Sequence, residues 1–315
     1  MKKIVCLILA LALCLCFFSA CGKKSDSYKV GICQLAPHVA LDAATQGFKD
    51  ALVEELGDKV TFDEQNAAGE SSNCATIVNK FVSDKVDLIM ANATPALQAA
   101  TSATDSIPVL ATSITEYGVA LGIEGFTGTV GGNISGTSDL APLDEQAAMI
   151  KEWCPDASTV GLIYCSAEAN SQYQVDNVQA ALEALGYTCT QYSFADTSDM
   201  ASVVQNAADN NDVLYVPTDN TCANNTGIID NICHGKVPVF CGEEGICEGC
   251  GVATLSINYY DLGVATGKMA AKILKGETKV GEMPIEYAPK FTKKANATMC
   301  ADLGLTIPDG YEMIG

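Results

Sequence analysis

The sequence predicts an α/β protein made of two doubly wound, Rossmann-like lobes. Short apolar runs rich in β-branched residues alternate along the chain with amphipathic stretches of helix length, which is typical of βαβ units and parallel sheets. The same order of runs occurs twice, and this repetition predicts two lobes of similar architecture. A length of 315 residues and an apolar content of 48% suffice for two domains with buried cores.

Residues 1–20 have the pattern of a secretory signal peptide. Two lysines precede an apolar run, residues 4–18, that is too short to span a membrane as a helix. Small residues follow and lead to Cys21, which resembles the lipobox at which bacterial signal peptidase II cuts before a cysteine that becomes lipidated. We therefore expect residues 21–27 to form a lipidated tether at the outer face of the cytoplasmic membrane. Ordinary secretion, with Cys21 as a plain thiol, is the alternative.

The repeated pattern pairs strands of the first half with strands of the second half. Each pair combines an apolar strand with a similar flanking sequence, and helix-length stretches follow the strands. In chain order the matched segments are 30–34 with 160–164, 87–94 with 212–219, and 107–110 with 237–240.

Polar residues follow these strands, where parallel α/β sheets bind ligands. In the first half the loops begin at Gln34, Thr94 and Ser113, and in the second half at Tyr164, Asp219 and Gly242. We expect these six loops to face each other across one cleft.

The two halves differ in the chemistry of these loops. The first half offers neutral side chains: Gln34, His38, Thr94, Ser113 and Thr115. The second half offers carboxylates: Glu168, Asp219, Glu243 and Glu244. This asymmetry favours a zwitterion whose ammonium pairs with acids and whose carboxylate rests on hydroxyls and helix N-termini. The alternative is that these residues act only as helix N-caps.

Charge limits the ligands and partners of the chain. It carries 38 acidic residues against 18 lysines, a formal net charge of −20, so nucleic acid and anionic membrane surfaces are poor partners. The sequence contains no arginine, so a bidentate guanidinium clamp on a carboxylate or phosphate is impossible. A bound anion must be held by backbone N–H groups, hydroxyls or lysine.

The 15 cysteines do not predict a metal site. Most of those after Cys21 lie in apolar runs, where a free thiol behaves as a small hydrophobe, and disulfides remain the alternative. Cys247 and Cys250 have the spacing of a zinc knuckle but lack a second pair. We expect neither a metal nor a cofactor.

A collinear set of motifs resembles a known family. The set contains Gln34-Leu-Ala-Pro-His38, Ala93-Thr94-Pro95, Ser138-Asp139, Glu168-Ala-Asn170-Ser171, Thr218-Asp219-Asn220 and Tyr259-Tyr260-Asp261. Together these motifs resemble the substrate-binding proteins of ABC transporters that include tryptophan and tyrosine importers, the TrpX-like family. The match spans nearly all of residues 29–290.

The resemblance implies a type I periplasmic-binding fold with a three-segment hinge. Lobe 1 would comprise residues 28–138 and 258–280, and lobe 2 residues 139–257 and 281–315. It also implies an aromatic amino acid as ligand, an ABC permease and its ATPase as partners, and a monomer that closes around its ligand. The candidate ligand-binding residues are Gln34, His38, Thr94, Pro95, Ser113, Thr115, Tyr164, Glu168, Asn170, Ser171, Asp219, Asn220 and Glu244.

Two stretches depart from the family pattern and bear on ligand identity. Ile114-Thr-Glu-Tyr117 and Tyr164-Cys-Ser-Ala167 replace the usual Val-Thr-Asp-Pro and Tyr-Asn-Pro-Gly. We expect Tyr117 and Tyr164 to pack against a planar ligand, unless Tyr164 is a core aromatic at a strand end.

Other functions remain as alternatives. An enzyme is disfavoured because the Gly128–Gly132 loop lacks the Walker spacing and ending, and the two histidines form no recognisable triad. The same fold binding a sugar or a nucleobase, or acting as a sensor, is the closer alternative.

Overall fold

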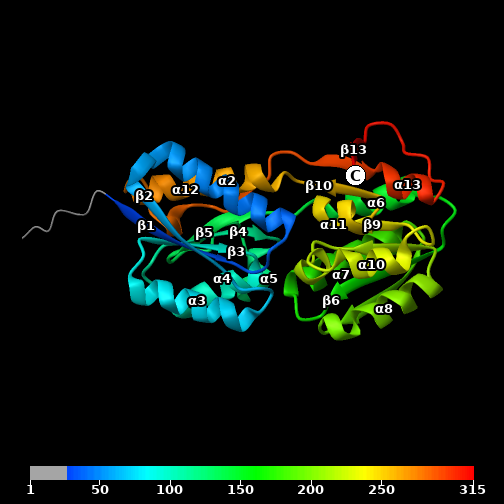
Figure 1. The fold of residues 1–315 in the computed structure, drawn as a ribbon, viewed down its shortest axis with the longest axis horizontal. Coiled ribbons are helices and arrows are strands. Elements are labelled where there is room, and N and C mark those ends of the chain that lie inside the picture. The colour runs from blue at the N-terminus through cyan, green and yellow to red at the C-terminus, as the bar shows by residue number, and fades with distance from the viewer. Residues whose placement is uncertain (1–26) are drawn as a thin grey trace, which may run out of the picture.

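The computed structural model describes residues 27–315 as two α/β lobes joined by three segments (Figure 1). The expected signal peptide, the lipidation site Cys21 and most of the tether lie outside the described residues. Within residues 27–315, no helix is long and apolar enough to cross a membrane.

Lobe 1 is built on a six-stranded parallel sheet with the order β11-β5-β4-β3-β1-β2. Its strands are β1 (Tyr28–Gln34), β2 (Val60–Asn66), β3 (Leu88–Asn92), β4 (Val109–Ile114), β5 (Ile134–Ser138) and β11 (Glu286–Tyr287). Apolar residues of α2 (Val39–Leu56) and α12 (Tyr259–Leu274) pack in one core, and those of α3 (Ser71–Asp84) and α4 (Thr94–Ala103) in another. The short elements η1 (Gly57–Lys59), α5 (Tyr117–Leu121) and η2 (Val280–Glu282) complete the lobe.

Lobe 2 has a seven-stranded sheet with the order β13-β12-β10-β9-β8-β6-β7, in which only the β10–β12 pair is antiparallel. Its strands are β6 (Thr159–Cys165), β7 (Thr188–Phe194), β8 (Val213–Val216), β9 (Val239–Cys241), β10 (Ala253–Ser256), β12 (Thr292–Asn296) and β13 (Glu312–Ile314). One core contains α6 (Leu143–Trp153), α7 (Ala169–Ala184) and α13 (Ala297–Asp302); the other contains α8 (Thr197–Asn210), α9 (Asn220–Ala223), α10 (Thr226–Cys233) and α11 (Glu244–Cys250).

The chain crosses between the lobes three times. The crossings follow β5, β10 and β11, and the third lies at residues 288–291. The expected boundary after residue 280 differs from this structure, because β11 pairs with β5 and because Val280, Met283 and Ile285 are buried in the cores of lobe 1. Lobe 1 therefore extends to Tyr287.

Helices α2 and α12 pack closely because glycines lie at their contact. A Cβ atom at Gly47 would overlap the Tyr260 carbonyl, and one at Gly263 would overlap the Ala44 carbonyl. This contact joins the first helix of lobe 1 to the helix that returns from lobe 2 (Figure 1). It fixes the position of both helix N-termini, which face the cleft between the lobes.

Candidate functional site

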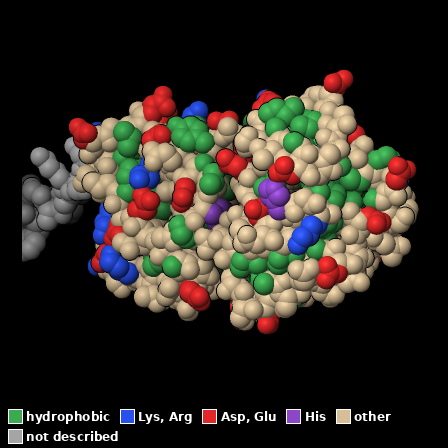
Figure 2. All heavy atoms as spheres, turned by 45° about the vertical axis from the view of Figure 1, so that its right-hand side comes forward, with side chains coloured by type: hydrophobic (Ala, Val, Ile, Leu, Met, Phe, Trp, Pro, Cys, Tyr) green, Lys and Arg blue, Asp and Glu red, His purple; other side chains and the backbone are tan. Residues whose placement is uncertain are grey.

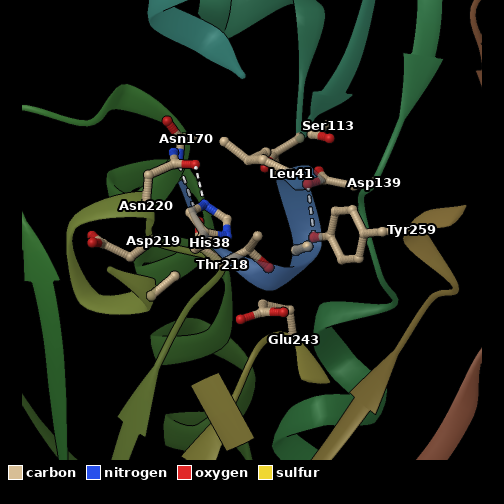
Figure 3. A pocket seen from close by; sticks show the side chains of 13 residues that line it. His38, Leu41, Ser113, Asp139, Asn170, Thr218, Asp219, Asn220, Glu243 and Tyr259 are labelled. Carbon is tan, nitrogen blue, oxygen red and sulfur yellow. Dashed lines mark hydrogen bonds between the residues drawn. The ribbon is translucent and has the colours of Figure 1, made fainter. Parts of the chain in front are cut away.

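A cavity lies where the carboxyl ends of the two sheets meet, with about 300 Å³ of empty space when the open solvent at its mouth is included. The enclosed part of this space is only about 10 Å³, roughly the room for one water molecule, so the lobes or the lining side chains must move apart to admit a larger ligand. Both lobes line the cavity, together with the first crossing (Figure 3). The lining residues are His38, Ala40, Leu41, Ser113, Thr115, Asp139, Asn170, Thr218, Asp219, Asn220, Ala223, Glu243 and Tyr259.

Ser113 lies at the end of β4 with its hydroxyl buried and without a hydrogen-bond partner. Its backbone has a φ of 57°, an uncommon left-handed conformation for a residue other than glycine. Strain of this kind is found where surrounding structure holds a functional side chain in place. The unpartnered hydroxyl is available to a ligand.

Asp139 follows β5 on the first crossing and is 5% exposed. The Tyr259 hydroxyl donates to its Oδ2 at 3.0 Å, whereas Oδ1 is buried without a partner. Burial raises the pKa of Asp139 to about 6. A buried carboxylate oxygen with no donor is costly, so Asp139 is suited to receive a cationic donor from a ligand.

Asp219 and Glu243 also line the cavity, but helix termini occupy their oxygens. Asp219 caps α9, accepting from the backbone N–H of Cys222 at 2.8 Å, and its other oxygen accepts from that of Cys165 at 2.7 Å. Glu243 caps α11 through the N–H groups of Gly245 and Ile246. Burial raises the pKa of Asp219 and that of Glu243 to about 7. Each carboxylate therefore has a capping role in the structure.

A polar network connects the lobes at the opposite end of the cavity from Asp139 (Figure 3). His38 Nε2 of lobe 1 lies 3.3 Å from Asn220 Oδ1 of lobe 2. Asn220 in turn donates to Glu168 Oε2 through Nδ2 at 2.7 Å, and Asn170 contacts the same oxygen at 3.3 Å. Burial lowers the pKa of His38, which favours the neutral ring at this end of the cavity.

The cavity contains six of the thirteen candidate ligand-binding residues: His38, Ser113, Thr115, Asn170, Asp219 and Asn220. Glu168 and Ser171 lie directly behind it. Glu168 accepts hydrogen bonds from Asn220 and Thr221, and Ser171 is fully buried beside Asn170.

The other five candidates lie away from the cavity. Gln34 is buried in bonds to Ala36, Asp42 and Thr45. Thr94 is buried at the start of α4, and Pro95 lines a separate surface hollow between α3 and α4. Glu244 forms an ion pair with Lys294. Tyr164 packs in the core of lobe 2, where its hydroxyl donates to Gln172 and Gln191.

Tyr117 likewise does not reach the cavity. It is 1% exposed in the core of lobe 1, stacked on Phe126, and its hydroxyl donates to the carbonyls of Ala111 and Thr137 at 3.1 Å. The expectation that Tyr117 packs against a ligand is wrong in this structure, because the side chain points back over β5.

Sequence reasoning did not select Asp139, Thr218, Tyr259 or Leu41 as ligand-binding residues. Asp139 follows the fifth strand, which has no partner among the matched segments, and Tyr259 opens the helix after β10. Asp139 lies on the first crossing and Tyr259 directly after the second, so neither belongs to the loops matched between the lobes. Their presence in family motifs was the available signal.

Within residues 27–315, no cluster of three or more His, Cys, Asp and Glu side chains could hold a metal ion. The cysteines of this region are all free thiols, and most are buried, including Cys247 and Cys250.

Comparison with known proteins identifies the family. A family model described as ABC transporter substrate binding protein matches residues 29–312. The chain belongs to this family. This substrate-binding protein is also 35% identical over 302 residues to the tyrosine-binding protein of Clostridioides difficile, in an alignment that covers 90% of this chain and 87% of that protein.

Two solved structures are similar to this substrate-binding protein over 91% of its chain and 99% of theirs. An L-Trp complex from Streptococcus pneumoniae has a TM-score of 0.86 at 32% identity. The ligand-free, open structure of a substrate binding protein with adhesive properties from Clostridium difficile has a TM-score of 0.70 at 35% identity. The two mostly parallel sheets and these neighbours define a type I periplasmic-binding fold.

The lobes of the substrate-binding protein are closed over the cavity. It resembles the L-Trp complex more than the open structure, although its identity to the open structure is higher. Beside the bond between His38 and Asn220, Val39 of lobe 1 packs against Gly245 of lobe 2, and α5 contacts α7. Acidic side chains are spread over the surface of both lobes on the face seen in Figure 2.

Proposed function

We propose that this substrate-binding protein captures a zwitterionic aromatic amino acid between its lobes and delivers it to an ABC permease and its ATPase. The protein binds its ligand without chemical change and acts as a monomer. The observation that carries the proposal is the interlobe cavity, in which the buried Ser113 Oγ and Asp139 Oδ1 lack hydrogen-bond partners. The names of the relatives, a tyrosine-binding protein and an L-Trp complex, support the ligand class.

The unpartnered groups of Ser113 and Asp139 match the chemistry of an amino-acid head group. A ligand ammonium would donate to Asp139 Oδ1, and the Ser113 hydroxyl would donate to the ligand carboxylate. The cavity is lined by three carboxyl groups and by no lysine, so it favours the ammonium over the carboxylate of the ligand. Ala40, Leu41 and Ala223 contribute the apolar part of the lining outside Tyr259.

A ligand screen tests the proposed function. The chain from residue 22 onward would be unfolded and refolded to remove carried ligand, then mixed with each of the twenty amino acids, with sugars and with nucleobases. A ligand at a hundred times its dissociation constant stabilises the protein by about 2.7 kcal/mol, which raises the unfolding midpoint. We expect tyrosine, tryptophan or phenylalanine to give the largest shift. A shift with sugars or nucleobases alone would contradict the proposal.

We also propose that lipid on Cys21 anchors the protein at the outer face of the cytoplasmic membrane. The lipobox-like sequence before Cys21 supports this location. In the producing cell, Cys21→Ser should prevent lipid labelling and release the protein from the membrane fraction. Retention in the membrane fraction without lipid label would refute the anchor.

A further inference from the structure

Asn170 lines the cavity, and its side chain has a second unpartnered acceptor. It is the second residue of α7 and is 6% exposed, and its Oδ1 atom is buried without a hydrogen-bond partner. A buried carbonyl oxygen without a donor is unfavourable in the closed protein, so the site is incomplete at this position.

The orientation of the Asn170 amide follows from its neighbours. Its Nδ2 lies 3.1 Å from the Thr218 carbonyl and 3.3 Å from Glu168 Oε2, and both of these groups only accept hydrogen bonds. Reversing the amide would place Oδ1 against a carbonyl and a carboxylate. The amide nitrogen therefore faces Glu168 and Thr218, and Oδ1 remains the free acceptor.

The other polar groups at this end of the cavity already have partners. Asn220 Oδ1 is bonded to His38 Nε2, and Asn220 Nδ2 donates to Glu168. Asp219 accepts from two backbone N–H groups. Among these described groups, Asn170 Oδ1 is the acceptor without a hydrogen-bond partner.

The residues with unpartnered polar atoms lie at opposite ends of the cavity. Figure 3 places Ser113 and Asp139 on one side and Asn170 and Asn220 on the other. An amino acid whose ammonium binds Asp139 therefore directs its side chain toward Asn170. The phenol O–H of tyrosine and the indole N–H of tryptophan are single donors on the ring, and phenylalanine has none.

We propose that Asn170 determines specificity by accepting a hydrogen bond from the ring donor of the ligand, so that the site selects tyrosine or tryptophan over phenylalanine. This inference rests on the proposed binding of aromatic amino acids. A site built to accept a ligand O–H or N–H rejects the analogue that lacks it, because the buried acceptor is then left unpaired. We expect phenylalanine to bind roughly 10- to 100-fold more weakly than tyrosine.

Isothermal titration of tyrosine, tryptophan and phenylalanine tests this role. Asn170→Ala should weaken tyrosine and tryptophan binding while leaving phenylalanine binding within about threefold, so that the preference collapses. Asn220→Ala is the matched control, since it removes the same type of side chain from the same cavity. Because Asn220 Oδ1 is bonded to His38, this variant should weaken all three ligands alike and keep the preference.

The outcomes separate the two proposals. If phenylalanine binds the unaltered protein as tightly as tyrosine and tryptophan, or if Asn170→Ala retains the preference, Asn170 does not read the ring donor and aromatic binding still stands. If no aromatic amino acid binds, the proposed function itself fails and the role of Asn170 fails with it. The preference of the unaltered protein decides the question even if the Asn170 variant does not fold.

Discussion

Three carboxyl groups line the cavity, but they differ in the partners of their oxygens. Asp219 and Glu243 cap helices, whereas Asp139 has one oxygen bonded to Tyr259 and one unpartnered. At the residue scale, removing a cap carboxylate changes stability, while removing the charge of Asp139 changes ligand binding. A cap carboxylate differs from a ligand-binding carboxylate in whether backbone N–H groups lie within hydrogen-bond distance of its oxygens. The sequence shows that a residue is acidic but does not show where these N–H groups lie.

Asp139→Asn should weaken tyrosine binding by about 1.5–3 kcal/mol, the usual worth of a hydrogen bond to a charged group. The amide keeps an acceptor for Tyr259, so the fold should persist. Titration with tyrosine and with its analogue lacking the amino group measures the effect, and only tyrosine should lose affinity. Asp144→Asn, an exposed residue near the same crossing, is the control for charge. Equal losses for both ligands would show that Asp139 does not hold the ammonium.

Stability of the ligand-free protein should fall as the pH rises from about 5 to about 7. Burial raises the pKa of Asp139 to about 6 and that of Asp219 and Glu243 to about 7, so the folded state binds more protons than the unfolded state in this range. The lowered pKa of His38 acts in the opposite direction, and the raised pKa of His234 acts in the same direction as the three carboxyl groups. Other carboxyl groups have lowered pKa values and oppose the trend mainly below pH 5: Glu55, Asp63, Asp84, Asp196 and Asp212.

Urea unfolding at pH 5 and pH 8 measures this difference. We expect the free energy of unfolding to be higher at pH 5 by at least about 1.4 kcal/mol, the worth of one pKa unit. Greater stability at pH 8 would mean that the three carboxyl groups are ionised at little cost.

The sequence predicted acids near the ligand but not which acid has a free oxygen. It identified Ser113 near the carboxyl end of a strand, and Asn170 and Asn220 through family motifs in the loops that follow strands. It could not separate them from Gln34 and Tyr164, which also end strands but point into hydrogen-bonded or apolar interiors. The direction of a side chain at a strand end depends on the turn that follows, and pattern reasoning does not supply it.

At the element scale, the contact between α2 and α12 depends on the absence of side chains. Gly47 and Gly263 let the two backbones approach closely, which buries Phe48 and Met269 between the helices and the sheet. Alternation of apolar runs predicted both helices. The two-residue strand β11 was missed because a run this short has no periodicity to detect.

Gly263→Ala should destabilise the protein by about 1–3 kcal/mol, because the new Cβ atom would overlap the Ala44 carbonyl. Gly227→Ala is the matched control: this helical glycine of α10 has open space around it, so alanine should stabilise the protein by up to about 1 kcal/mol. Denaturant unfolding of the two variants should give changes of opposite sign. If Gly263→Ala left the free energy of unfolding unchanged, the two helices would be able to move apart at little cost in free energy.

At the scale of the whole molecule, closure brings residues of different lobes into contact. Val39 Cβ lies 3.5 Å from the position that a Cβ atom at Gly245 would occupy. Three crossings connect the lobes, so closure moves each lobe as a body. The predicted two-lobe fold is confirmed, whereas the degree of closure is set by contacts such as His38 with Asn220 that no sequence pattern encodes.

The double variant Val39→Cys and Gly245→Cys should form a disulfide that locks the closed state. The Cβ separation of 3.5 Å is compatible with disulfide geometry. Under mild oxidation, ligand should accelerate formation of the cross-link, and the cross-linked protein should release ligand more slowly. Mass spectrometry after thiol alkylation detects the bond, with each single variant as control. A rate of cross-linking independent of ligand would argue against closure driven by the ligand.

The order of segments along the chain also has a consequence for biogenesis. Two elements of lobe 1 follow most of lobe 2 in the sequence: helix α12, which packs on the lobe 1 sheet, and the edge strand β11. Lobe 2 is completed only by β12 and β13, near the end of the chain. A chain emerging N-terminus first therefore cannot complete either lobe until its last quarter has appeared. Neither lobe can fold completely until its last segments are available. The polypeptide therefore contains no fully folded lobe during most of its passage through a secretion channel.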